Sequence, residues 1–258
     1  MPPTTPNSNK PIMKQQTLKS EFSLSGKGLH TGMMIHATFR PAPEGTGYVF
    51  RRTDLDGQPT VEAVAEHVVE TQRGTVVAAR NNKDVRVSTI EHALSALYAA
   101  GVDNCLIDVD GPEVPILDGS AAPFADAIAN VGLQDQQAEK EFYIVKQRIK
   151  VSDPDTGAEL VVLPDDDFAV DVMIEFDSPV LGNQFASLNN LAHYRESIAD
   201  CRTFVFLREV HPLLQHGLIK GGDLDNAIVI YDRTVAQDEL DALSDQLGVA
   251  DRKSTRLN

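Results

Sequence analysis

Residues 88–101 carry the strongest structural signal in the sequence and predict an α-helix. From Ile90 onward, apolar side chains recur at the three-to-four-residue spacing of a helix that buries one face. Ser88 and Glu91 have the spacing of a capping box, and Gly101 is a typical stop after the last helical turn. A helix with one apolar face needs a second layer to cover it, so the neighbouring segments decide the fold.

Short segments of alternating polar and apolar residues flank this helix and predict β-strands. In the first half they lie at residues 16–24, 34–40, 48–52, 75–80 and 104–109. In the second half they lie at 141–151, 159–163, 169–176 and 225–231, and helices are predicted at 123–131, 191–199 and 238–247. Strands and helices that are mixed without a regular βαβ alternation are typical of the α+β class.

The order of these elements predicts two α+β domains, each a two-layer sandwich of a sheet with helices on one face. Residues 1–12 are polar and proline-rich, and we expect a flexible leader. The first domain is expected at 13–137 and the second at 141–258, with the polar stretch 134–140 as the linker. We expect the second domain to be incomplete at its C-terminus.

Composition excludes several classes of function. The net charge of −15 argues against nucleic-acid binding, because that requires clustered Lys and Arg to neutralise phosphates. The two cysteines, Cys105 and Cys201, form no metal-binding or disulfide pattern, which fits a reducing compartment. No apolar run approaches the roughly 20 residues that span a bilayer. We therefore expect a cytoplasmic protein without stable membrane insertion.

Glu91 and His92 are adjacent at the start of the predicted helix and can carry metal-dependent chemistry. An imidazole can bind zinc, and a neighbouring carboxylate can take a proton from a metal-bound water. A structural interpretation is equally available, since Glu91 also fits a helix-capping acid and His92 a surface histidine. The same dipeptide occurs at Glu66 and His67 without further pattern. Taken alone, the dipeptide favours the structural interpretation.

Several ordered motifs change this balance, because together they resemble one enzyme family. The motifs are Lys-Gln-Gln-Thr-Leu-Lys at 14–19, Gly-Lys-Gly-Leu-His-Thr-Gly at 26–32, Arg-Pro-Ala-Pro at 40–43, Val-Arg-Val-Ser-Thr-Ile-Glu-His at 85–92, Pro-Glu-Val-Pro-Ile-Leu-Asp-Gly-Ser at 112–120, Cys-Arg-Thr-Phe at 201–204 and Gly-Gly-Asp-Leu-Asp-Asn-Ala-Ile-Val at 221–229. They resemble, in order and spacing, the zinc-dependent UDP-3-O-acyl-N-acetylglucosamine deacetylases of lipid A synthesis. The resemblance covers residues 14–247.

The resemblance implies chemical roles for three polar residues. His92 matches the first Zn²⁺ ligand of the family, and Glu91 matches its general base. Thr203 matches a hydrogen-bond donor to the oxyanion that forms at the reacting carbonyl. His30, in the glycine-rich turn, also matches the family, but its role stays open between turn stabilisation and catalysis. Asp118 is interpreted as a turn residue that bonds backbone groups.

The resemblance also implies an apolar passage for the acyl chain of the substrate. Phe204 matches a wall at the mouth of this passage, and Val210 and Ile219 match its lining. On the sequence alone, Val210 and Ile219 fit an ordinary hydrophobic core equally well. We expect the three side chains to lie close together if the resemblance extends to the passage.

The sequence departs from the family at its C-terminal end. The family completes its zinc site with a later helix of pattern His-Lys-x-x-Asp-x-x-Gly-Asp, and a further His protonates the leaving amine; neither occurs here. The polar tail 250–258 does not resemble the family, so we expect a truncation or an appended foreign sequence. His92 alone cannot hold zinc tightly, because catalytic zinc sites use three protein ligands and a water.

The segment 232–243 is longer than in the plainest family members and is similar to a branch that is fused to a hydroxyacyl-carrier-protein dehydratase. The implied function is zinc-dependent hydrolysis of the N-acetyl group of UDP-3-O-(3-hydroxyacyl)-N-acetylglucosamine, with the chain as given expected to be inactive. Two alternatives remain: a non-catalytic fragment that binds the acyl chain or the UDP-sugar, and the product of a broken gene.

Overall fold

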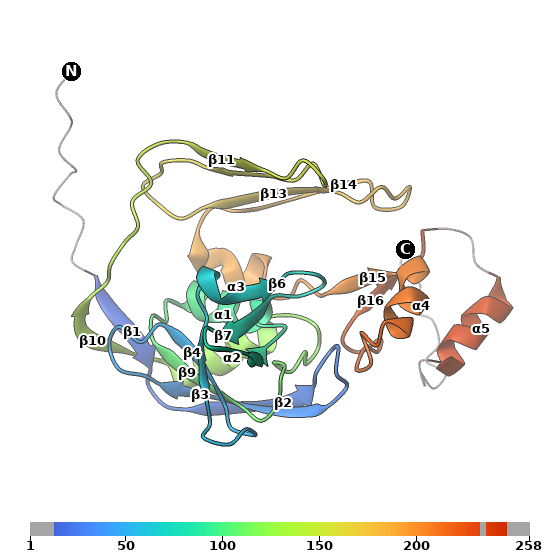
Figure 1. Cartoon of the computed structure of the whole chain (residues 1–258). Helices are drawn as coiled ribbons and strands as arrows, with labels where there is room; N and C mark the ends of the chain where they lie inside the picture. The colour runs from blue at the N-terminus through green and yellow to red at the C-terminus, as the bar shows by residue number, and fades with distance from the viewer. Residues whose placement is uncertain (1–12, 233–235, 247–258) are drawn as a thin grey trace.

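The computed structural model describes residues 13–232 and 236–246, which form a mixed α+β structure (Figure 1). The leader predicted at 1–12 and the tail at 250–258 lie outside the described residues. None of the helices in the described ranges is long and apolar enough to cross a membrane. The α+β class is confirmed, whereas the division into two sandwich domains stays a prediction.

A five-stranded sheet forms the base of the first half. Its strands follow the order β2 (Phe22–Lys27), β3 (Met34–Pro41), β9 (Cys105–Val109), β4 (Tyr48–Arg52) and β5 (Thr60–Glu62). The central strand β9 runs antiparallel to β3 and parallel to β4. Buried residues alternate along β3, as the sequence pattern predicts for a strand with one covered face.

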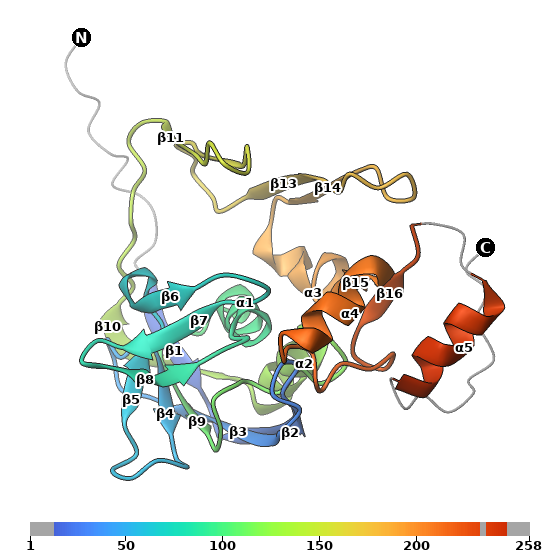
Figure 2. The same ribbon diagram turned by 45° about the vertical axis from the view of Figure 1, so that its right-hand side comes forward.

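Two helices and a second sheet cover this base (Figure 2). The helices are α1 (Glu91–Ala100) and α2 (Ala122–Val131), which pack against each other. The second sheet has three strands, β6 (Val68–Glu70), β7 (Val76–Ala79) and β8 (Asn82–Val87). The fully buried side chains Phe39, Phe50, Leu97, Ile107 and Phe124 come from the base sheet and both helices, so these layers share one core.

The strongest predicted helix is present, but its N-terminal cap differs from the prediction. The helix begins at Glu91 and ends at Gly101, whose left-handed conformation (φ 87°) makes the expected C-terminal stop. The predicted capping box is wrong. The Ser88 hydroxyl donates to the Pro112 carbonyl (3.1 Å), and a Glu91 oxygen accepts from the Thr75 backbone N–H (3.1 Å). The Glu91 carboxylate therefore faces the β6–β7 connection instead of capping its own helix.

The polar stretch that the sequence predicts to be a linker is a strand. β10 (Leu133–Glu139) pairs antiparallel with β1 (Lys14–Leu18) and returns the chain to its beginning. Polar side chains bond across the pair; the Gln16 amide, for example, donates to Asp135 (2.7 Å). Cross-strand polar pairs stabilise a half-exposed two-stranded ribbon, which explains why the segment lacks an apolar pattern.

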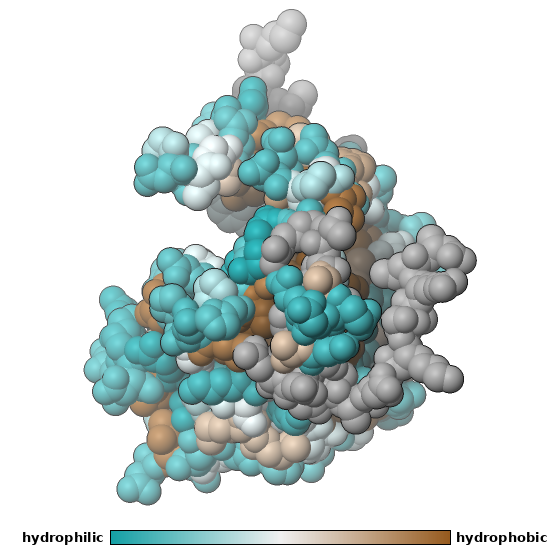
Figure 3. All heavy atoms as spheres, turned by 90° about the vertical axis from the view of Figure 1, so that its right-hand side faces the viewer, coloured by the Kyte–Doolittle hydropathy of each residue, from teal (hydrophilic) through white to brown (hydrophobic). Residues whose placement is uncertain are grey.

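The second half is less compact than the first. Two antiparallel hairpins, β11 (Ile149–Ser152) with β12 (Glu159–Val162) and β13 (Val170–Glu175) with β14 (Asn183–Leu188), project above the body (Figure 1). Large apolar side chains on them are exposed, among them Val151, Leu160, Met173 and Phe185. Hydrophobic residues, drawn in brown, reach the surface between hydrophilic ones on the face shown in Figure 3.

The remaining elements of the second half lie against the first half or continue towards the C-terminus. They are a 3₁₀ turn at Leu191–His193, α3 (Tyr194–Ser197), β15 (Phe204–Phe206), α4 (Leu207–Gln215), β16 (Ile228–Ile230) and α5 (Gln237–Gln246). Strands β15 and β16 pair in parallel. The predicted helix at 191–199 is thus a 3₁₀ turn followed by one short α-helix.

The two halves meet through direct backbone contacts. The Thr203 N–H donates to the Gly119 carbonyl (2.8 Å), and the Gly221 N–H donates to the Leu29 carbonyl (3.0 Å). A β-carbon at Gly119 would lie 1.8 Å from the Asn226 carbonyl oxygen, and one at Gly221 would lie 2.1 Å from the Gly28 carbonyl oxygen. Only glycine permits these approaches, so the junction is fixed at the level of the main chain.

We expect Gly119→Ala to disrupt the junction, and Gly57→Ala is the matched control. Both glycines have a positive φ (83° and 75°), but a β-carbon at Gly57 meets no atom within 4 Å. In both variants the left-handed conformation of the alanine lowers the free energy of unfolding by about 1–2 kcal/mol. Gly119→Ala should lose about 1–3 kcal/mol more in urea denaturation, because the backbone of 226 must move. Equal losses in the two variants would contradict a tight junction.

Candidate functional site

The junction of the two halves encloses a narrow cavity of about 70 Å³. The predicted site residues Thr203, Phe204, Val210 and Ile219 all line it. Phe204 begins β15 and Thr203 directly precedes it, Val210 lies in α4, and Ile219 lies in the loop that follows α4. The structure thus brings together Phe204, Val210 and Ile219, the three side chains that the sequence predicts to be close, and places Thr203 beside them.

Phe204 belongs to a cluster of three aromatic rings. Its ring lies edge-on to those of Phe176 (5.3 Å) and Phe206 (5.9 Å), and such T-shaped pairs stabilise beyond simple burial. Phe204 is 36% exposed, whereas Val210 is 3% exposed. Phe204 therefore stands at the boundary between solvent and cavity, and Val210 lies deeper.

Neither Glu91 nor His92 is among the described residues that line this cavity, but Glu91 lies close to it. A β-carbon at Gly74 would be 3.6 Å from both the Glu91 Oε1 and the His30 Nε2 atoms, so the segment at Gly74 brings Glu91 close to a cavity residue. Glu91 itself is exposed. An exposed carboxylate that one backbone N–H orients can exchange a proton with water.

The environment of His92 favours a neutral imidazole. Burial lowers the pKa of His92, and the negative charges of Glu91 and Asp118 only partly oppose this. A neutral imidazole is the form that binds metal ions. Asp118 also accepts from the Ser120 N–H (3.0 Å) and hydroxyl (2.8 Å), so the prediction that it bonds backbone groups is confirmed.

The described residues do not form a complete metal site. Within residues 13–232 and 236–246, no group of three His, Cys, Asp or Glu side chains is arranged to hold a metal ion. Three protein ligands are the usual minimum for catalytic zinc, and here His92 supplies one. The residues present therefore do not fit a zinc ion on their own.

His30 lines the cavity and its ring is held from one side. Its Nε2 lies 3.0 Å from the Arg73 carbonyl, which can only accept, so Nε2 carries the proton. Its Nδ1 is buried without a hydrogen-bond partner among the described residues. Arg73 also lines the cavity, and its guanidinium pairs with Glu209 on α4 (2.9 Å).

The sequence prediction missed Glu113, the most fully buried acidic residue near the site. Its side chain is inaccessible (0% exposed) and accepts from the His30 N–H (2.9 Å), the Thr31 N–H (3.0 Å) and the Thr89 hydroxyl (2.8 Å). A β-carbon at Gly28 would meet this carboxyl at 2.3 Å. The one hint in the sequence is that an acidic residue lies between the prolines of a turn at 112–115. The groups that donate hydrogen bonds to Glu113 lie in other segments, so the sequence does not reveal its burial.

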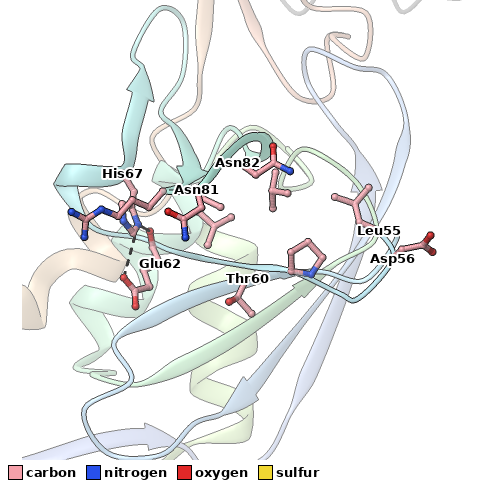
Figure 4. A pocket seen from close by; sticks show the side chains of 12 residues that line it. Leu55, Asp56, Thr60, Glu62, His67, Asn81 and Asn82 are labelled. Atoms are coloured by element: carbon pink, nitrogen blue, oxygen red, sulfur yellow. Dashed lines mark hydrogen bonds and ion pairs between the residues drawn. The ribbon is translucent and has the colours of Figure 1, made fainter.

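A second, larger hollow lies elsewhere on the first half (Figure 4). It has a volume of about 570 Å³ and lies between the β4–β5 turn and the β7–β8 hairpin. Its rim carries polar side chains such as Glu62, His67 and Asn82. It contains none of the predicted site residues.

The geometry defines an α+β protein whose two halves line an apolar cavity, with the solvent-exposed carboxylate of Glu91 close to the cavity residue His30. A family model described as "LpxC: UDP-3-O-acyl N-acetylglycosamine deacetylase" matches residues 15–245. The chain belongs to this family, whose members are zinc-dependent amide hydrolases of lipid A biosynthesis.

Similar proteins include both fused and single enzymes. A "Bifunctional enzyme LpxC/FabZ" of Porphyromonas gingivalis is 58% identical over 246 residues, which cover 95% of this chain and 53% of the relative. A protein of the same name from Bacteroides thetaiotaomicron is 53% identical, over 92% of this chain and 51% of that protein. A "UDP-3-O-acyl-N-acetylglucosamine deacetylase" of a Geobacter species is 43% identical, over 87% of this chain and 72% of that protein. The chain spans about half the length of the bifunctional relatives.

Proposed function

We propose that this chain carries the acyl-binding cavity and the proton-transfer groups of a deacetylase. The reaction is hydrolysis of the N-acetyl group of UDP-3-O-(3-hydroxyacyl)-N-acetylglucosamine in lipid A biosynthesis. The observation that carries the proposal is the convergence of Thr203, Phe204, Val210 and Ile219 on one cavity at the junction of the two halves. Family membership supplies the reaction class.

Two polar residues have roles that follow from their own chemistry. Glu91 would act as the general base, because its exposed carboxylate is oriented by the Thr75 N–H and can take a proton from water. Thr203 would donate a hydrogen bond from its hydroxyl to the oxygen that becomes negative when water adds to the amide carbonyl. The main chain of Thr203 is fixed by its hydrogen bond to Gly119, which limits the freedom of this donor.

The cavity supports an acyl ligand over a purely polar one. Phe204, Val210 and Ile219 offer apolar surface, and removing a methylene group from water is worth about 0.8 kcal/mol. The UDP-linked, acylated glucosamine is therefore the proposed substrate, with the sugar at the exposed end near Phe204. This arrangement would leave the acetamido group on the side of Glu91.

Zinc is the metal that the family uses, and His92 is the residue of this chain that would bind it. The other residues described here do not complete the site. The same observation favours a second candidate function, a non-catalytic unit that binds the acyl chain or the UDP-sugar. Zinc binding with turnover would support the deacetylase, and ligand binding without turnover would support the non-catalytic unit.

A dehydratase is a further proposed partner, because the first relatives carry the name LpxC/FabZ. We propose that a hydroxyacyl-carrier-protein dehydratase accompanies this deacetylase, fused or separate. The polypeptide is proposed to act in the cytoplasm, without nucleic acid and without stable membrane insertion.

Glu91→Ala tests the general base. The host is a longer protein in which this chain continues into the remaining half of the Porphyromonas gingivalis relative. We expect kcat to fall by about 10²–10⁴-fold, because one positioned base contributes that much, while zinc content stays near normal. Steady-state kinetics and metal analysis provide the measurement. An unchanged kcat would leave Glu91 with a structural role only.

Phe204→Ala tests the acyl cavity in the same host. KM should rise more for substrates with long acyl chains than for those with short ones, because each buried methylene group contributes about 0.8 kcal/mol. Phe142→Ala is the control, since Phe142 is 61% exposed and lies outside the cavity lining. A KM change that is independent of chain length would contradict the assignment.

Residues 1–258 alone are expected to release no acetate and to bind zinc weakly. Zinc affinity arises from several oriented ligands acting together, and His92 is the family ligand that this chain contains. Metal content after dialysis, together with an acetate-release assay on the UDP-sugar substrate, checks this. Stoichiometric zinc with turnover would show that another residue, such as His30 or His211, completes the site.

A further inference from the structure

The cavity is too small, as it stands, for the ligand that the proposed function assigns to it. Pockets that hold ligands of that size measure roughly 300–1,000 Å³, whereas this one has about 70 Å³. An acyl chain can therefore enter only after some part of the lining moves. The residue that moves should lie on the boundary between cavity and solvent and should be weakly held.

Arg73 meets the first condition. It lines the cavity, yet its side chain is 45% exposed, so it separates the interior from solvent. It sits in the connection between β6 and β7, in the first half of the chain. Its guanidinium reaches across to Glu209 in the first turn of α4, in the second half (2.9 Å). The ion pair therefore spans the junction at the edge of the cavity.

Arg73 also meets the second condition, because the interactions that hold it in place are weak. The Glu209 side chain is 29% exposed, and ion pairs at such accessible positions contribute about 0–1 kcal/mol. The second oxygen of Glu209 is buried without a partner among the described residues, as is the Nδ1 atom of His30. Each unpaired buried acceptor disfavours the closed arrangement, and water can satisfy both when the segment moves.

The backbone adds to this tendency. Arg73 has a positive φ of 59°, a conformation that side chains other than glycine adopt at an energetic cost. Glu209, once released, stays favourable at the N-terminal end of α4, where the helix dipole stabilises negative charge. The closed arrangement is thus held mainly by the ion pair and by the His30–Arg73 hydrogen bond.

We propose that Arg73 and Glu209 form a latch that determines which ligands enter the cavity. The ion pair breaks, the segment around Arg73 moves away from α4, and the acyl chain then occupies the space between Phe204 and Val210. Neither latch residue is proposed to touch the reacting amide, so both are specificity-determining residues. The inference rests on the proposed function only in taking an acyl chain as the ligand.

The latch should lower the affinity for the ligand by a predictable factor. If the open form is a minor population, the apparent affinity is reduced by that fraction, and any change that favours opening strengthens binding. Salt screens an accessible ion pair, so it should favour opening. A neutral acyl ligand has no charge of its own to be screened, so a salt effect that is larger in the wild type than in a variant without the ion pair is diagnostic.

The test measures binding of decanoyl-N-methylglucamide, a neutral acyl amide, to the full chain below the micelle concentration of the ligand. Calorimetry would compare the wild type with Arg73→Ala, Glu209→Gln and the charge swap Arg73→Glu with Glu209→Arg. Arg80→Ala is the control, because Arg80 is an exposed arginine outside this cavity. Thermal unfolding of each variant verifies that it is folded.

We expect both single variants to bind about two- to fivefold more tightly than the wild type, the range that an accessible ion pair can supply. The charge swap should return the affinity towards the wild-type value, and Arg80→Ala should leave it unchanged. Sodium chloride should strengthen binding to the wild type more than to Arg73→Ala. A swap that fails to restore the affinity while the single variants bind more tightly would overturn the latch in favour of simple widening of the cavity.

Two further outcomes are distinguishable. Equal affinity of all folded variants at every salt concentration would overturn the latch and leave acyl binding intact. No binding by any folded variant, including Arg73→Ala, would overturn the assignment of the cavity to acyl chains and the latch with it.

Discussion

The buried carboxyl group of Glu113 is the interaction on which the arrangement of the site depends. It accepts hydrogen bonds from the glycine-rich turn at His30 and Thr31 and from the Thr89 hydroxyl just before α1. The same group therefore sets the position of a cavity wall and of the helix start that carries Glu91. An unpaired buried acceptor or donor costs about 1–3 kcal/mol, so neither segment can leave this carboxyl without penalty.

Much of the fold follows from local sequence patterns. The helix at 88–101 is nearly correct in its bounds, because apolar periodicity and the final glycine are local signals. The sequence predicts a linker where the strand Leu133–Glu139 lies, because the polar side chains of this strand bond to partners on β1 and leave no apolar period. The capping box failed because the Ser88 hydroxyl is used by Pro112, a partner that only the tertiary structure supplies.

Sequence motifs and tertiary contacts contribute differently to the candidate site. The family motifs identify Thr203, Phe204, Val210 and Ile219, and the structure brings all four to one cavity. Periodicity cannot show that a glutamate between turn residues is inaccessible, since the donors around Glu113 lie in other segments. An ion pair between Arg73 and Glu209 is equally invisible in sequence, because it joins a loop of one half to a helix of the other.

The pairing of β10 with β1 has a consequence for how the polypeptide is made. Leu18 on β1 lies opposite Leu133 on β10, so a strand synthesised at the beginning finds its neighbour only near the middle of the chain. Contacts of such long sequence separation form slowly, since a large loop must close before they are gained. During translation, β1 leaves the ribosome with an unpaired edge and keeps it until residue 139 has emerged. An open strand edge can pair with another chain, so the first half is most exposed to aggregation during this interval.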